Sequence, residues 1–110
     1  MAAPYGLTVN CSDDETLVFT VVFEMTDGDD FPFGDYEIEY LVKDEAGGER
    51  LNLSDTTTGV TVDAPYVTFM SDAGSLEVGR YTHGCRLRAI ADDTLTMVFD
   101  GQVLVSEGTF

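Results

Sequence analysis

Two stretches of alternating residues decide the fold: TLVFTVVFEM (Thr16–Met25) and YEIEYLVK (Tyr36–Lys43). Every second residue of the first stretch is a large hydrophobe, namely Leu17, Phe19, Val21 and Phe23. In the second stretch, the apolar residues that should face inward are Tyr36, Ile38, Tyr40 and Val42. A period of two with many β-branched residues predicts half-buried strands. Both stretches are therefore expected to be strands.

The rest of the chain shows the same kind of short apolar segments, separated by turn residues. Further strands are expected at Arg50–Leu53, Val60–Val62, Tyr66–Met70, Arg80–Ile90, Thr94–Phe99 and Gln102–Ser106. Turn residues separate these segments, and Asp100-Gly101 has the composition most typical of a tight hairpin turn. The pattern predicts an all-β chain, an immunoglobulin-like β-sandwich of about seven to nine short antiparallel strands. The chain has no Trp, which argues against the antibody lineage of that fold.

Length and charge limit the classes of function. The 110 residues suit a single domain spanning 1–110, with residues 1–10 as an extended N-terminal arm. Hydrophobic residues make up 44% of the chain, enough for a core, but 21 acids against 5 bases give a net charge of −16. Such a field repels phosphates and anionic lipids, so neither nucleic acid nor a membrane is expected as a main partner.

Cysteine usage and the first residues bear on the compartment. The start, Met1 to Gly6, has no basic region followed by an apolar stretch, so no signal peptide is expected. Cys11 and Cys85 show no CxxC spacing, and two reduced thiols are expected. A single bridge between the two cysteines is the alternative.

Few residues offer chemistry. His83 is the only histidine, and Cys85 shares its strand face, but a zinc site needs three or four ligands. A buried histidine and a buried thiol are the expected interpretation. The sequence contains no nucleophile elbow, Walker loop or HExxH motif. We therefore expect no enzymatic activity, catalytic residue, cofactor or metal.

Two acidic clusters could in principle hold calcium. They are Asp13-Asp14-Glu15 and Asp27-Gly28-Asp29-Asp30. The known calcium loop needs spaced acids, a Gly at the sixth position and a closing Glu, and neither cluster has this arrangement. A solvated acidic rim is the preferred interpretation, with calcium between the two loops as the alternative.

The candidate partner-binding residues lie in three places. Arg80, Arg86 and Arg88 share one strand and should pair with Glu37 and Glu39 on a neighbouring strand, with a docking patch as the alternative.

The other two places are apolar. The segment from Ala2 to Val9, which includes Tyr5 and Leu7, either donates a strand to a neighbour's sheet or forms the first strand of its own sheet. Phe31 and Phe33 form either an exposed anchor or a lid on the core.

The C-terminal third carries a family resemblance. LEVGRYTH (Leu76–His83), with its L-x-x-G-x-Y pattern, is followed by LTMVFDGQVLVS (Leu95–Ser106). Together with the strand order upstream, residues 16–106 resemble small tailed-bacteriophage structural proteins. They are also similar to the N-terminal immunoglobulin-like domain of phage baseplate upper proteins.

The resemblance implies a non-enzymatic structural protein of the virion, assembled in the host cytoplasm. Such a protein docks on the particle as a capsid decoration or cement protein, or as a tail or baseplate adaptor. Its implied partners are the major capsid protein or tail and baseplate proteins, and a homo-oligomer is a further alternative.

A different class of function stays open, a carbohydrate-binding or adhesion module. Sugar binding commonly uses a platform of exposed aromatic side chains. Tyr5, Tyr66 and Phe110 are the candidates for such a platform.

Overall fold

The computed structural model describes residues 5–25, 30–72 and 74–109. Its eight described strands are β1 (Tyr5–Ser12), β2 (Val18–Val22), β3 (Tyr36–Lys43), β4 (Glu49–Ser54), β5 (Val60–Asp63), β6 (Tyr66–Met70), β7 (Gly79–Ala89) and β8 (Leu95–Ser106). A short 3-10 turn, η1 (Phe33–Asp35), precedes β3. Among the described residues, none belongs to a helix long and apolar enough to cross a membrane.

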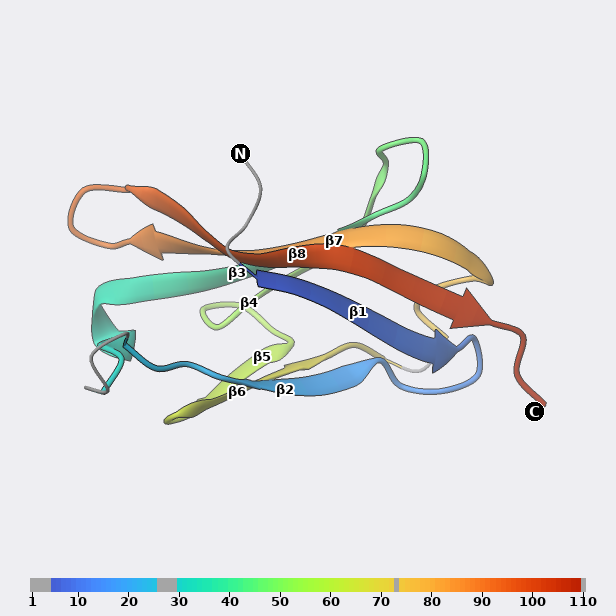
Figure 1. The fold of residues 1–110 in the computed structure, drawn as a ribbon, viewed down its shortest axis with the longest axis horizontal. Helices are drawn as coiled ribbons and strands as arrows, with labels where there is room; N and C mark the ends of the chain where they lie inside the picture. Colours follow the sequence, from blue (N-terminus) through green and yellow to red (C-terminus); the bar gives the residue numbers. More distant parts are fainter. Residues whose placement is uncertain (1–4, 26–29, 73, 110) are drawn as a thin grey trace.

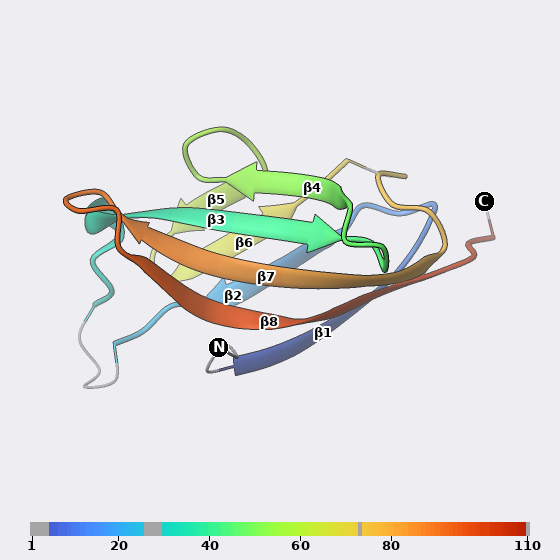
Figure 2. The same ribbon diagram turned by 90° about the horizontal axis from the view of Figure 1, so that it is seen from above.

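The strands form two sheets that face each other (Figure 1). The larger sheet has the order β1-β8-β7-β3-β4, and the smaller has the order β2-β6-β5. Figure 2 shows the larger sheet from above, with the smaller sheet crossing behind it. The all-β sandwich expected from the sequence is therefore confirmed.

One strand pair departs from the expected antiparallel arrangement. β1 runs parallel to β8, from Tyr5 opposite Phe99 to Ser12 opposite Ser106, whereas the other described strand pairs are antiparallel. Because β1 continues into β2 of the other sheet, no hairpin dictates its direction. Residues 5–12, with Tyr5 and Leu7, thus form a strand of the chain's own sheet, which is the second alternative given for the segment from Ala2 to Val9. Residues 2–4 of that segment lie outside the described residues.

The expected hairpin turn at Asp100-Gly101 is wrong. β8 passes through both residues without a break, and Gly101 lies opposite His83 on one side and Leu7 on the other. Gly101 has a φ of +153°, and a Cβ there would collide with the Leu7 carbonyl group. The glycine permits a close approach of two backbones rather than a turn.

The core lies between the sheets and is rich in aromatic rings. The inward face of β3 supplies Ile38, Tyr40 and Val42, all almost fully buried. Phe69 from β6 stacks on Phe19 from β2 with ring centres 5.0 Å apart. The alternation predicted for β2 and β3 thus places the expected residues inside.

The Phe31-Pro32-Phe33 tip closes one end of this core. Phe31 and Phe33 are half-buried and lie 4.9 Å apart, ring centre to ring centre. Phe31 also contacts the ring of buried Phe23 at 5.4 Å. The two phenylalanines therefore form the lid rather than the exposed anchor.

Candidate functional site

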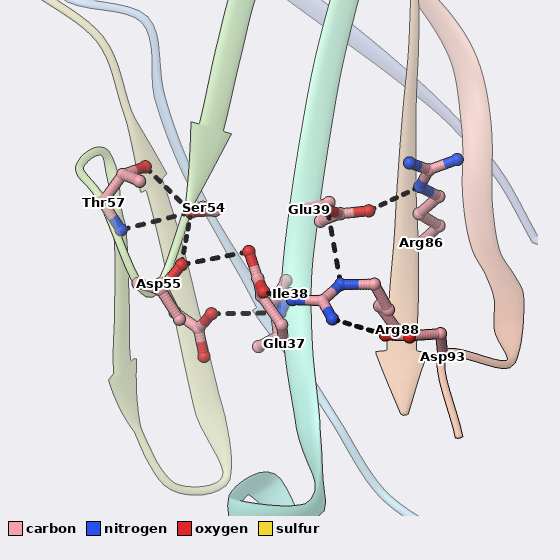
Figure 3. Close-up of polar contacts among 10 residues, drawn as sticks. Glu37, Ile38, Glu39, Ser54, Asp55, Thr57, Arg86, Arg88 and Asp93 are labelled. Atoms are coloured by element: carbon pink, nitrogen blue, oxygen red, sulfur yellow. Dashed lines mark hydrogen bonds and ion pairs between the residues drawn. The ribbon is translucent and has the colours of Figure 1, made fainter. Parts of the chain in front are cut away.

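The outer face of the larger sheet carries a ladder of ion pairs (Figure 3). Glu39 on β3 lies opposite Arg86 on β7, and Arg86 Nε donates to Glu39 Oε1 at 2.6 Å. Arg88 lies opposite Glu37, contacts its carboxylate, and donates to Asp93 Oδ1 at 2.7 Å. Hydrogen bonds first to Asp93 and then to Glu37 raise the pKa of Arg88. The cross-strand pairs expected for Arg86 and Arg88 are thus present.

The third arginine of the strand behaves differently. Arg80 is exposed and lies opposite Leu104 on β8. Within the described part of the chain, no carboxylate forms an ion pair with it. The expected pairing with glutamates therefore applies to two arginines of the three.

His83 is held in the core by both ring nitrogens. The carbonyl oxygen of Leu7 can only accept, so His83 Nε2–H donates to it at 2.7 Å. The Nδ1 atom then accepts from the Tyr40 hydroxyl at 2.8 Å. The histidine joins β7 to β3 and to edge strand β1, as a core residue.

Burial lowers the pKa of His83 from its ordinary value of 6.5, against smaller opposing effects of the Leu7 hydrogen bond and the Asp100 charge. Between the two pKa values the unfolded chain binds more protons than the folded one, so stability falls as pH drops below about 6.5. We expect His83 to titrate below 6.5 in an NMR pH series. We also expect wild type to lose stability relative to His83→Gln between about pH 7.5 and 5, measured by urea unfolding. A stability difference that does not change with pH contradicts this expectation.

The two cysteines are not bonded to each other, and the described residues of the acidic clusters form no metal site. Cys11 and Cys85 are both free thiols, and burial raises the pKa of Cys85 to about 12. Asp13 accepts a hydrogen bond from the Gly108 backbone at 2.7 Å. No three of the described His, Cys, Asp or Glu residues are grouped as metal ligands. Of the second acidic cluster, residues 27–29 lie outside the described residues.

The outer face of the smaller sheet is largely apolar, in contrast to the charged outer face of the larger sheet. Three cross-strand pairs project outward there, Val18 with Met70, Thr20 with Thr68 and Val22 with Tyr66. We call these six residues the neutral face. Its four large apolar side chains are each about half exposed: Val18 52%, Val22 49%, Tyr66 51% and Met70 53%. The hydroxyl groups of Thr20 and Thr68 form a hydrogen bond with each other at 2.9 Å.

The neutral face is a surface suited to burial. Charged residues make up 24% of the chain, but none is among these six residues. Acids flank them: Asp63, the last residue of β5, lies opposite Tyr66, and Glu24 and Asp72 come two residues after Val22 and Met70. Burying these six side chains removes apolar area from water, and none of the six carries a charge that would have to be desolvated. Exposed apolar patches of this kind are typical of contact surfaces.

Sequence reasoning did not single out this surface. The usable signal was the outward half of the first alternating stretch, where Val18 and Val22 stand at positions that polar residues usually take. Met70 gives the same signal on β6. Only the pairing of β2 with β6 shows that these residues meet on one face.

The candidate aromatic platform is not assembled from its described members. Tyr5 is 70% exposed on β1 of the larger sheet, whereas Tyr66 lies on β6 of the smaller one. Phe110 lies outside the described residues. The two tyrosines thus belong to different sheets.

Comparisons with known proteins identify the fold. No protein-family model and no curated protein match the chain. It is similar to the solved structure of the NK cell receptor NKp44, with 16% identity, a TM-score of 0.55, and coverage of 96% of this chain and 99% of that one. It is also similar to CopC from Methylosinus trichosporium OB3b, with 18% identity, a TM-score of 0.46, and coverage of 99% and 91%. The fold is an immunoglobulin-like β-sandwich.

Proposed function

We propose that the protein is a non-enzymatic structural protein of a tailed-phage virion, which docks on the particle through its neutral face. The observation that carries the proposal is the contrast between the two outer faces. One presents Glu37, Glu39, Arg86 and Arg88 in ion pairs, and the other presents the apolar side chains of Val18, Val22, Tyr66 and Met70, with Asp63 as the charged cross-strand neighbour of Tyr66. An uncharged face on a chain of net charge −16 favours contact with a larger partner over self-association, since two copies repel each other.

Two positions on the particle fit this surface. One is the capsid exterior, where the protein serves as a decoration or cement protein bound to the major capsid protein. The other is the tail or baseplate, where it serves as an adaptor. In both positions the acidic remainder of the surface stays in solvent and keeps neighbouring copies apart.

Quantitative mass spectrometry of purified particles tests the proposal. A ratio of this protein to the major capsid protein near one, or one for every few subunits, identifies a capsid decoration protein. A handful of copies identifies a tail or baseplate component. Complete absence from the particles overturns the proposal.

A charge placed on the neutral face should prevent docking. We expect Val18→Asp to lower the occupancy of the protein on particles at least tenfold, because docking then desolvates a carboxylate. Thr82→Asp is the matched control, since Thr82 is exposed on the outer face of β7. Occupancy is measured by the same mass ratio on particles assembled with each variant. Equal occupancy of the two variants contradicts docking through the neutral face.

A further inference from the structure

A polar hollow lies on the outer face of the larger sheet, next to the ion pairs of Figure 3. It has a volume of about 420 Å³, in the range of sites that hold a small molecule. Its floor lies where Leu41 on β3 is opposite Gly84 on β7. Gly84 has no side chain to fill this point, and its φ is not in the left-handed region, so the backbone does not require a glycine there. The glycine therefore keeps the floor of the hollow open.

Hydrogen-bonding side chains from three neighbouring strands stand around this floor. They are Lys43 and Glu39 on β3, Asn52 on β4 and Arg86 on β7. Lys43 and Glu39 are each two residues from Leu41, so they stand on the same sheet face about 14 Å apart, on opposite sides of the floor. Described strands bound the hollow here, because β3 and β4 lie third and fourth from β1 in the sheet order. The spacing leaves room for one pyranose ring with its substituents.

The rim offers both donors and acceptors of hydrogen bonds. Lys43 is exposed and forms no ion pair among the described residues, so its ammonium group can donate to a ligand. Arg86 uses only Nε in its ion pair with Glu39, which leaves the other N–H groups of the guanidinium as donors. Asn52 presents an amide oxygen as an acceptor, while its amide nitrogen donates to Glu49 at 2.8 Å. A ligand with hydroxyl groups around its edge can therefore be hydrogen-bonded from several sides.

The charged groups of the hollow balance each other. Its charged lining residues in the described part of the chain are two cations and two anions, Lys43, Arg86, Glu39 and Asp100. Leu41 and the exposed side chain of Met97 add apolar surface. The net charge of −16 repels an acidic ligand, and a hollow without an excess of acid gives a cationic ligand no preferred partner. A neutral ligand with a polar edge and an apolar face is therefore matched best.

A sugar ring has these properties to a greater degree than a peptide side chain. Each sugar hydroxyl both donates and accepts, and the hydroxyls are spread around the ring, whereas a side chain carries its polar atoms at one end. We propose that the hollow binds one neutral hexose unit of a saccharide. The C–H face of the ring packs over Leu41 and Gly84, and its hydroxyls form hydrogen bonds with Lys43, Glu39 and Asn52 at the rim.

This site is separate from the surfaces described above. Tyr40 and His83 lie beneath it, but both side chains are buried in the core, so the site is not the aromatic platform considered for Tyr5 and Tyr66. The outer faces of the two sheets point away from each other (Figure 1), so a copy docked through the neutral face leaves the hollow in solvent. The inference goes beyond the proposed virion role and does not depend on it.

The test is an amide NMR titration of the full chain with the methyl pyranosides of glucose, galactose, mannose and N-acetylglucosamine, all of them neutral. A methyl glycoside cannot open to an aldehyde, so it cannot react covalently with Lys43. We expect at least one of the four glycosides to give saturable shifts of the Leu41 and Gly84 amides, with a dissociation constant in the millimolar range. Acetyl-glutamic acid amide represents an acidic peptide side chain, and we expect no saturation with it.

Gly84→Val and Gly6→Val form the first matched pair of variants. A Cβ at Gly84 has the methyl group of Met97 as its nearest neighbour, at 3.3 Å, and this end of a flexible side chain can move aside. Gly6 is not among the lining residues of the hollow, and a Cβ there meets no atom within 4 Å. Valine suits a strand at both positions. We expect Gly84→Val to weaken sugar binding at least tenfold, because its side chain fills the floor, and Gly6→Val to leave it within twofold.

Lys43→Ala and Arg80→Ala form the second pair, which tests the rim without changing the floor. Each variant removes one positive charge, but Arg80 is not among the lining residues. We expect Lys43→Ala to weaken sugar binding about tenfold or more, the usual result of losing a hydrogen bond to a charged group. Arg80→Ala should leave binding within twofold. A non-specific effect of charge predicts equal losses for the two variants.

Several results overturn the proposal. They are the absence of saturable shifts with all four glycosides, undiminished binding by Gly84→Val, and equal losses in Lys43→Ala and Arg80→Ala. Saturation by the acidic probe at a lower concentration than by any glycoside also overturns it, in favour of a peptide site. The virion proposal is judged separately, since occupancy on particles depends on the neutral face, on the other side of the sandwich.

Discussion

Replacing Gly101 by Ala is expected to destabilise the protein by about 2–4 kcal/mol, the sum of overpacking and backbone strain. A Cβ at this position meets the Leu7 carbonyl oxygen and lies 2.8 Å from its carbonyl carbon. Because these are backbone atoms of β1, no side chain can rotate away to make room. The φ of +153° adds strain for any residue with a side chain. The loss should appear in urea unfolding followed by circular dichroism.

The matched control is Gly6→Ala, one residue before Leu7 on the same strand. A Cβ on Gly6 meets no atom within 4 Å. This variant is expected to keep or slightly raise stability, because alanine loses less backbone entropy than glycine on folding. If the two variants unfold at the same urea concentration, the close approach of β1 and β8 is not a feature of the folded protein.

Replacing Phe69 by Ala is expected to cost about 3–5 kcal/mol, the usual result of emptying a buried aromatic site. The Phe69 side chain is 1% exposed, and its ring contacts those of Phe19, Tyr40 and Phe99 at 5.0, 5.1 and 5.8 Å between centres. These rings come from four different strands of both sheets. The cavity therefore cannot collapse without moving the sheets toward each other.

Tyr66→Ala tests the same strand on its other face. Tyr66 is three residues away, half exposed on the neutral face, and its loss should cost less than about 1 kcal/mol. Thermal unfolding of both variants measures the difference. Similar losses for Phe69→Ala and Tyr66→Ala would mean that the neutral face is covered in the folded protein.

The sequence predicted those parts of the fold that depend on local periodicity. β3 occupies the predicted range Tyr36–Lys43, and its partner β7 has the predicted inward face with His83 and Cys85. The pairing of Arg86 and Arg88 with glutamates followed from charge alternation and strand order alone. The strand ranges and inward faces depend on residues that are close together in the sequence. The ion pairs depend in addition only on which strand lies beside β7.

Features that depend on tertiary contact could not be predicted in the same way. Asp100-Gly101 has the composition of a turn, but contact with Leu7 of β1 and His83 of β7 fixes it in a strand. The parallel direction of β1 has no local signal, since it depends on where the chain crosses to the other sheet.

The parallel pairing of β1 with β8 has a mechanical consequence. Tension applied between Tyr5 and Ser106 pulls the two neighbouring strands in opposite directions along their common axis, because the start of one and the end of the other are loaded. The hydrogen bonds from Tyr5 opposite Phe99 to Ser12 opposite Ser106 then share the load together, in shear, instead of breaking one after another. An antiparallel pair joined by a hairpin opens by peeling from its ends. This sandwich is thus built to resist stretching along its long axis.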